Sequence, residues 1–325
     1  NDFIEDVDSL NMNKKNKQIL LVSPRGFCAG VTRAVDVVLE TLKTYGSPVY
    51  VKHEIVHNKY VIRDLEQKGT IFIEDVENVP SDRPLIFSAH GVSKKIVNQS
   101  KNNKSIVIDA TCPLVTKVHV QARKFYEEGI KIVLIGHRNH PEVEGTMGQL
   151  PEGSISLIEK ISDIEKLDFN KDDRIGFITQ TTLSIEDTNS IILELRKRFP
   201  NIKSSPKEDI CYATTNRQNA IKAHASKCDS FIVIGSENSS NSNRLVEVAT
   251  NSGCKDARLL EDASKLNLEE YNNANIIGIS SGASVPDILV EEVVDKFEEY
   301  FNIEIEHAIY GEENVSFKLP KELRK

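Results

Sequence analysis

Three cysteines share one local setting, because a predicted strand ends just before each of them and a segment with helical spacing begins just after. They are Cys28, Cys112 and Cys211. A cysteine at the start of a helix faces the positive end of the helix dipole and several unpaired N–H groups, which favours its thiolate form. If three similar units pack about an axis, the three thiolates converge on one point. Such a set suits an iron-sulfur cluster held by three cysteines, with one iron open for substrate.

The other two cysteines, Cys228 and Cys254, lack this setting. We expect them to be ordinary buried or half-buried thiols. Five cysteines in 325 residues do not resemble the disulfide framework of a small secreted domain. A reducing compartment is therefore expected.

An internal repeat surrounds the three cysteines. Each copy has the cysteine junction, then an apolar strand that runs into a polar loop, then a short strand that ends at an acidic residue, then another strand and polar loop. The predicted strands cover residues 49–51, 71–73 and 85–87, then 132–135, 155–158 and 175–178, and finally 231–234, 257–260 and 276–279. The copies are predicted to be three related domains.

Continuous apolar strands that alternate with helical segments are typical of parallel sheets covered by helices on both faces. The expected fold class is therefore α/β, with three similar units. Their predicted bounds are 19–108, 109–207 and 208–325, after a flexible leader over 1–18. Because ligands bind at the carboxyl ends of parallel strands, the polar loops of all three units could line one central cavity.

The polar loops carry different side chains in the three units. The first supplies His57 and His90, the second His140, Glu142 and Thr181, and the third Ser239, Asn241 and Ser284. One such residue alone in a loop is usually solvated or caps a turn. Their recurrence at equivalent positions indicates a functional site.

One motif has a competing interpretation. Residues 53–57 spell H-E-x-x-H, the signature of zinc proteases, which requires both histidines on one face of a helix. The preceding residues are typical of a strand, and the helix is predicted to start after Asn58. We therefore expect that His53 and His57 are not held as a metal-binding pair.

Composition excludes several classes of protein. No apolar run approaches the roughly 20 residues that a membrane span needs. A formal net charge of -8 argues against a general nucleic-acid binder, which would carry a basic face. The phosphate-binding loop G-x-x-x-x-G-K-[ST] and the dinucleotide motif G-x-G-x-x-G are both missing from the sequence. No nucleic acid, membrane or nucleotide is therefore expected as a partner.

Four stretches together resemble the 4-hydroxy-3-methylbut-2-enyl diphosphate reductase family of the non-mevalonate isoprenoid pathway. They are Pro24 to Val31, Asp109 to Pro113, His140 to Thr146 and Asn238 to Arg244. The resemblance covers the chain from about Gln18 to the C-terminus. It implies a pseudo-threefold trefoil of α/β domains around a 4Fe-4S cluster. It also implies that the substrate alcohol binds the iron without a cysteine ligand and that isopentenyl and dimethylallyl diphosphates are the products.

The resemblance also implies a role for each matching residue. Cys28, Cys112 and Cys211 would be the cluster ligands. Thr181 would hydrogen-bond the substrate hydroxyl, and Glu142, with His140 beside it, would start proton delivery to the leaving oxygen. The residues that would hold the diphosphate are His57, His90, His140, Ser239, Ser240, Asn241 and Ser284.

Partners and location follow from the same resemblance. The electron donor is expected to be a transiently bound protein of ferredoxin or flavodoxin type. The leader and its Asn/Lys bias suggest a plastid-type, apicoplast-like organelle reached through a removed targeting segment, with bacterial cytoplasm as the alternative. Two other interpretations remain, an iron-sulfur dehydratase similar to quinolinate synthase and a non-enzymatic iron-sulfur sensor or carrier.

Overall fold

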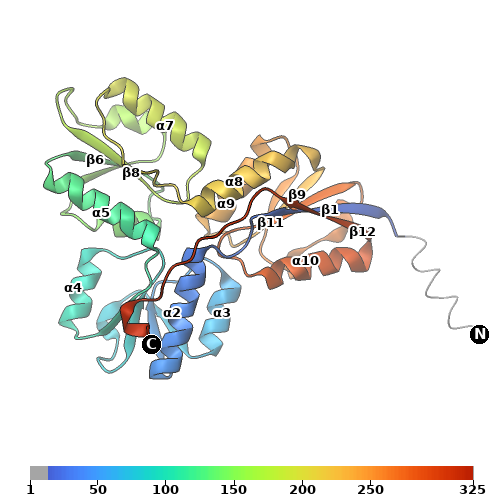
Figure 1. The fold of residues 1–325 in the computed structure, drawn as a ribbon, viewed down its shortest axis with the longest axis horizontal. Coiled ribbons are helices and arrows are strands. Elements are labelled where there is room, and N and C mark those ends of the chain that lie inside the picture. The colour runs from blue at the N-terminus through green and yellow to red at the C-terminus, as the bar shows by residue number, and fades with distance from the viewer. Residues whose placement is uncertain (1–13, 325) are drawn as a thin grey trace, which may run out of the picture. The chain divides into compact units, whose positions relative to one another are not determined.

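Three β-sheets form the core of the computed structural model, which describes residues 14–324 (Figure 1). Every strand pair within these sheets is parallel. Parallel strands need helical crossovers that cover the sheet, and this accounts for the regular alternation of strands and helices. The predicted α/β class is confirmed. Within the described residues, no helix is both long enough and apolar enough to cross a membrane.

The chain divides into two compact units, of which one combines residues up to 27 with 215–314. Its sheet has the order β10 (Ala257–Leu260), β9 (Ser230–Ile234), β11 (Ile276–Ser281), β1 (Asn16–Ser23) and β12 (Asn302–Ile309). The helices α8 (Tyr212–His224) and α9 (Ser240–Asn251) pack on one face and α10 (Asp287–Tyr300) on the other (Figure 1).

Strand β1 shows why the sheet of this unit is covered on both faces. Its residues Ile19 and Leu21 belong to the core beneath α10, whereas Leu20 and Val22 belong to the core beneath α8 and α9. Successive side chains of a strand point to opposite faces, so an uninterrupted apolar run suits a central strand.

The second unit combines residues 28–214 with 315 onward and contains two sheets. The first has the order β3 (Thr70–Ile73), β2 (Val49–Lys52), β4 (Pro84–Phe87) and β5 (Ile106–Asp109), with α2 (Ala29–Tyr45), α3 (Lys59–Gln67) and α4 (Lys94–Asn102). The other has the order β7 (Ile155–Ile158), β6 (Lys131–Ile135) and β8 (Ile175–Thr179). Its helices are α5 (Pro113–Glu127), α6 (Pro141–Met147) and α7 (Ile185–Arg198).

Short 3-10 helices occur in both units, at Val76–Asn78, Ile161–Lys166, Ala225–Lys227, Ala263–Lys265, Leu268–Tyr271 and Lys321–Leu323.

One strand order recurs in all three sheets. The orders β3-β2-β4, β7-β6-β8 and β10-β9-β11 are equivalent, and each uses the three strands that the internal repeat predicted. The polar loop after the central strand and the polar loop after the last strand of each copy therefore leave the same edge of each sheet. This repeated plan places the predicted site residues at carboxyl ends of strands.

The structure differs from the prediction at two boundaries. Residues 19–22 were expected in the first unit, but β1 pairs with β11 and β12. It begins at Asn16, inside the expected leader, whose residues 1–13 lie outside the described part of the chain. Before Cys211 the sequence suggested a strand, whereas the structure has a single bridge between Gly176 and Lys203.

A buried arginine fixes the backbone just before Cys28, the first of the predicted cluster ligands. Arg217 is 1% exposed. Its Nη1 donates to both carboxylate oxygens of Glu313, at 2.9 and 3.1 Å, and its Nη2 donates to the carbonyl of Gly26 at 2.8 Å. A buried guanidinium that loses its carboxylate keeps the cost of desolvation without compensation.

Replacing Glu313 by Ala should therefore lower the free energy of unfolding by about 3 to 5 kcal/mol. Denaturation in urea measures the change. Glu312→Ala removes an exposed carboxylate one residue away and should change little. Equal stability of the two variants would show that the ion pair contributes nothing net.

Candidate functional site

Two of the three cysteine thiols lie close to the same glycine. Cys28 is the N-cap of α2 and Cys112 the N-cap of α5. A Cβ atom added to Gly30 would lie 2.7 Å from the Cys112 sulfur and 3.8 Å from the Cys28 sulfur. The first turn of α2 therefore needs glycine here, because any other side chain would collide with the sulfur of Cys112.

Main-chain hydrogen bonds connect two of the cysteines to the polar loops. The N–H of Cys112 donates to the carbonyl of Ala89 at 3.0 Å, next to His90. The N–H of Cys211 donates to the carbonyl of Thr181 at 3.1 Å. Each thiol is thus fixed relative to a neighbouring loop by backbone, which moves less than side chains.

Burial changes the expected protonation of the thiols. Loss of water raises the pKa of Cys112 to about 12 and that of Cys211 to about 11. Hydrogen bonds from N–H groups at the helix starts act in the opposite direction but are outweighed. The expectation that the helix N-terminus alone favours the thiolate is therefore wrong for these two residues. A bound cation would reverse the balance, because coordination deprotonates a thiol.

Three imidazoles from three loops form a cluster in the same unit. The ring centroids of His57 and His90 are 4.0 Å apart, and that of His140 lies 5.5 Å from His57 and 6.0 Å from His90. These residues follow β2, β4 and β6, which lie in two different sheets. The repeated strand plan thus brings together all three histidines that the sequence singled out.

Two of the clustered histidines, His90 and His140, are neutral. Burial lowers the pKa of His140 to about 3, and burial together with neighbouring imidazoles brings that of His90 well below its usual 6.5. The Nδ1 of His140 accepts a hydrogen bond from the N–H of Glu142 at 3.1 Å, so the ring proton of neutral His140 is on Nε2. The cluster therefore offers N–H donors without costly buried charges.

Glu142 and Thr181 form a buried pair. Glu142 is 4% exposed, and its carboxyl oxygens accept hydrogen bonds from the N–H of Thr181 at 2.6 Å and from its hydroxyl at 2.9 Å. Burial raises the pKa of Glu142 to about 7, and the charge of Asp209 adds to this shift while the bonds from Thr181 oppose it. A carboxyl group with this pKa can hold and release a proton at neutral pH.

The remaining predicted residues lie in the other unit and meet at the start of α9. Ser239 is its N-cap and accepts a bond from the N–H of Ser242 at 3.2 Å, and Ser240 is the first helical residue. Asn241 Oδ1 accepts from the N–H of Ala283 at 2.8 Å, which joins the loop after β9 to the loop that carries Ser284. The Nδ2 of Asn241 is buried and makes no hydrogen bond in the described residues.

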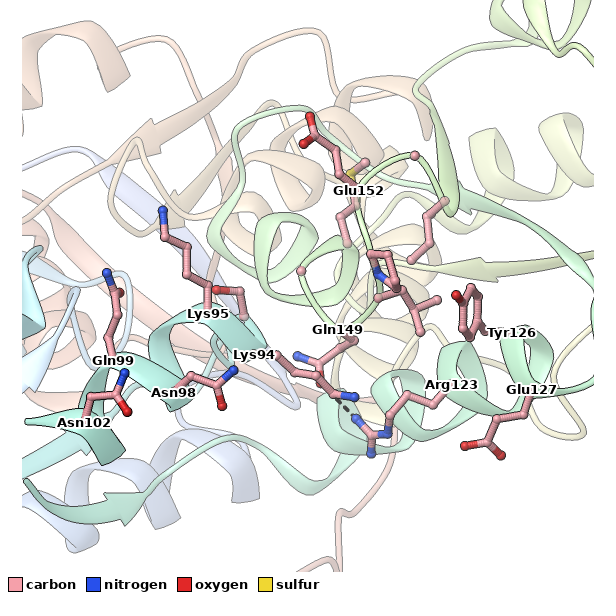
Figure 2. A pocket seen from close by; sticks show the side chains of 17 residues that line it. Lys94, Lys95, Asn98, Gln99, Asn102, Arg123, Tyr126, Glu127, Gln149 and Glu152 are labelled. Carbon is pink, nitrogen blue, oxygen red and sulfur yellow. Dashed lines mark hydrogen bonds between the residues drawn. The ribbon is translucent and has the colours of Figure 1, made fainter. Parts of the chain in front are cut away.

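One cavity of this unit is lined by none of these residues. It has a volume of about 1040 Å³ and is lined by α4, α5 and the segment from Met147 to Gly153. Figure 2 shows Arg123 and Gln149 within it, joined by a hydrogen bond of 2.8 Å, with Lys94 and Asn98 on the α4 side. None of the predicted site residues lines this cavity, so its size does not mark the site.

Several residues near the site were not predicted from the sequence. The buried Asp209 accepts from the N–H of Thr179 at 3.1 Å and influences Glu142. The hydroxyl of Tyr212 accepts from the N–H of Ala29 at 3.0 Å, between the flanks of Cys28 and Cys211. Asp209 and Tyr212 lie close to Cys211 in the sequence, and this position beside a predicted cluster ligand could have identified them.

The H-E-x-x-H stretch is a loop in the structure. Helix α3 starts at Lys59 and Asn58 caps it, so the predicted helix start is confirmed. The ring centroids of His53 and His57 are nevertheless 5.7 Å apart, in edge-to-face orientation. The two rings are thus neighbours, but they lie in a loop and not on one face of a helix, as the zinc-protease motif requires.

Together, the parallel sheets and the groups at their strand ends define an α/β protein with clustered thiols, imidazoles and a protonatable carboxyl group. The model of the LytB protein family matches residues 19–298. The chain belongs to this family.

Relatives with assigned names cover nearly the whole chain. A 4-hydroxy-3-methylbut-2-enyl diphosphate reductase from Paracoccus denitrificans is 49% identical over 96% of this chain and 99% of its own length. The enzyme of the same name from Beijerinckia indica is 51% identical over 96% and 98%.

Solved structures give the same result. The E-1-hydroxy-2-methyl-but-2-enyl-4-diphosphate reductase from Plasmodium falciparum has a TM-score of 0.92 and 42% identity, and the match covers 95% of this chain and 97% of that one. A second reductase structure, described as the terminal enzyme of the non-mevalonate pathway, has a TM-score of 0.63 and 32% identity over 87% and 99%.

The raised pKa of Glu142 has a measurable consequence. Since its pKa of about 7 in the folded chain exceeds the ordinary value of 4.5, the folded state binds more protons between these limits. The contribution of this residue to the free energy of unfolding is therefore greatest at low pH and falls as the pH rises through about 7. Infrared difference spectra between the parent and Glu142→Gln should show a protonated carboxyl group with a midpoint near pH 7.

The exposed neighbour Glu144 provides the control. Glu144→Gln should leave this signal intact. A signal already lost near pH 4.5 would contradict the assigned pKa.

Proposed function

We propose that this chain reduces 4-hydroxy-3-methylbut-2-enyl diphosphate to isopentenyl and dimethylallyl diphosphates. The observation that carries the proposal is the grouping, within one unit, of clustered imidazoles, the Glu142–Thr181 pair and the cysteines beside them. Imidazoles suit an anionic ligand, a neutral carboxyl group suits proton donation, and thiols suit iron. The names of the relatives agree with this combination.

The thiol set fits an iron-sulfur cluster. Three soft sulfur donors in one unit select iron-sulfur, zinc or copper centres rather than hard cations. The absence of a side chain at Gly30 keeps both sulfurs free of a clash, because a Cβ there would lie 2.7 Å from the sulfur of Cys112 and 3.8 Å from that of Cys28. No group of three or more His, Cys, Asp or Glu side chains in the described residues could hold a single metal ion. A 4Fe-4S cluster has a different requirement, since each cysteine binds its own iron.

In this proposal Cys28, Cys112 and Cys211 hold the cluster. When bound, the cluster would supply electrons to the substrate and leave one iron without a cysteine ligand. The electrons come from a protein of ferredoxin or flavodoxin type that docks transiently.

The chain's own residues bind the diphosphate. His57, His90 and His140 contribute donors from one unit. The neutrality of His90 and His140 in the free protein means that these two rings maintain no buried charge before the anion arrives. The donors proposed from the other unit are Ser239, Ser240, Asn241 and Ser284. The buried Nδ2 of Asn241 supports this assignment, because a buried donor without a partner is costly unless a ligand uses it.

Glu142 and Thr181 deliver the proton. Loss of the hydroxyl group as water requires a proton on the departing oxygen. The hydroxyl of Thr181 already donates to Glu142 at 2.9 Å, so a substrate hydroxyl beside Thr181 would join a short hydrogen-bonded chain that ends at a protonatable carboxyl. His140 fixes the start of α6, on which Glu142 lies.

We further propose that the protein works in a plastid-type organelle. The Asn/Lys bias near the start of the sequence supports this location, whereas the bacterial relatives support the alternative, bacterial cytoplasm. Microscopy of the tagged protein in its own cells distinguishes them.

The cysteine assignment gives one prediction. Cys112→Ser should lose most of the bound iron after anaerobic purification, whereas Cys254→Ser, which changes a fully buried thiol in another core, should retain it. Iron content and the visible absorption spectrum measure the effect. Full iron content in Cys112→Ser would exclude the proposed ligand set.

The assignment of proton delivery to Glu142 gives a second prediction. Glu142→Gln keeps size and hydrogen bonding but cannot release a proton, so kcat should fall by about a hundredfold to ten-thousandfold while KM changes little. Anaerobic turnover of 4-hydroxy-3-methylbut-2-enyl diphosphate with excess chemical reductant measures both. Glu144→Gln is the matched control. Parent-like turnover by Glu142→Gln would assign proton delivery to another group, and no turnover by the iron-loaded parent would refute the proposed function.

A further inference from the structure

A fourth imidazole adjoins the histidine cluster. The ring centroid of His53 lies 5.7 Å from that of His57 and 6.0 Å from that of His90. Its Nε2 is buried and makes no hydrogen bond in the described residues. A buried ring nitrogen without a partner costs free energy unless a ligand or a proton uses it.

A carboxylate holds the other nitrogen of this ring. The Nδ1 of His53 lies 2.7 Å from Oε1 of Glu74, and Lys52 donates to Oε2 of the same carboxylate at 2.8 Å. Partial burial opposes ionisation of Glu74, but these two hydrogen bonds outweigh it and lower the pKa of Glu74. Glu74 is therefore ionised and accepts the Nδ1–H of His53, so that a proton on Nε2 would make the ring an imidazolium paired with this carboxylate.

The backbone at His53 has an unfavourable conformation. Its φ of 61° lies in the left-handed region, which few residues other than glycine adopt without cost. The N–H of His53 donates to the carbonyl of Ile73 at 2.7 Å, so the strand that precedes Glu74 fixes both backbone and side chain. Strained residues held by their surroundings are concentrated at binding sites.

We propose that His53 is a further binding residue of the anion site: it takes up a proton on Nε2 when a diphosphate binds, and Glu74 stabilises the resulting imidazolium. The proposal rests on the function proposed above. It adds one charge-assisted donor to the neutral donors of the cluster, at the moment when the ligand supplies the compensating negative charge.

The charges around His53 are consistent with this role. Glu74 favours the imidazolium, and the charge of Lys52 opposes it. A positive charge on His53 lowers the pKa of His90 and His140, so these two rings stay neutral beside it. Glu54 bonds His57 at 3.3 Å. A cavity of about 360 Å³ is lined by His53, Lys52, Glu74 and Glu144 among others, which gives solvent protons access to the pair.

The test uses iron-loaded protein and inorganic diphosphate as the probe. Anaerobic calorimetry in two buffers of different ionisation enthalpy gives the Kd and the number of protons taken up. His53→Asn should weaken binding by about ten- to a hundredfold and reduce the proton uptake, because one charge-assisted bond is lost. Asn tolerates the left-handed backbone, so the fold should survive. His307→Asn, at an exposed position on the edge strand β12, is the matched control and should bind as the parent does.

A second pair of variants tests the carboxylate. Glu74→Gln should also weaken diphosphate binding and lower proton uptake, while Glu77→Gln, an exposed carboxylate three residues further along, should not. Parent-like affinity and proton uptake in His53→Asn would overturn this proposal and leave the proposed function intact. A parent protein that binds no diphosphate would overturn both.

Discussion

Removal of water from ionisable side chains is the constraint on which the site depends. In residues 28–214 it raises the pKa of Cys112, Cys211 and Glu142 and lowers that of His90 and His140. All five shifts favour the uncharged form. Every one of these groups can therefore be buried in the free chain, and each becomes charged or changes partner only when a metal or an anion compensates.

Parallel sheets make this concentration of polar groups possible. The strands bury their apolar runs on both faces, so the loops at their carboxyl ends are the places where polar side chains can gather. Backbone bonds from Cys112 to Ala89 and from Cys211 to Thr181 then fix the loops against each other. The apolar cores thus supply the rigidity, and the loop sequences supply the chemistry.

Strand periodicity and motif spacing predicted the α/β class, the repeated strand order and the histidine cluster. These features depend on local pattern and on a topology rule, and both can be read from sequence. The partner of β1 could not be predicted, because a strand that is apolar on both faces fits any parallel sheet equally well. The protonation of Cys112 was misjudged for a related reason, since the helix dipole is a local effect whereas desolvation depends on the whole fold. His53 was set aside because only its helical context was considered, and its contact with Glu74 comes from a separate strand.

Strand β1 also has a consequence for the order of events during synthesis. It lies between β11 and β12, so the unit that contains it joins the first described residues of the chain to strands that are made more than 250 residues later. Residues 28–214 are continuous and can bury their two sheets as soon as they leave the ribosome, whereas β1 must wait. Throughout that time an apolar strand with unpaired edges is exposed. Rapid completion of the chain, or a chaperone that covers β1 until β11 and β12 exist, would shorten this exposure.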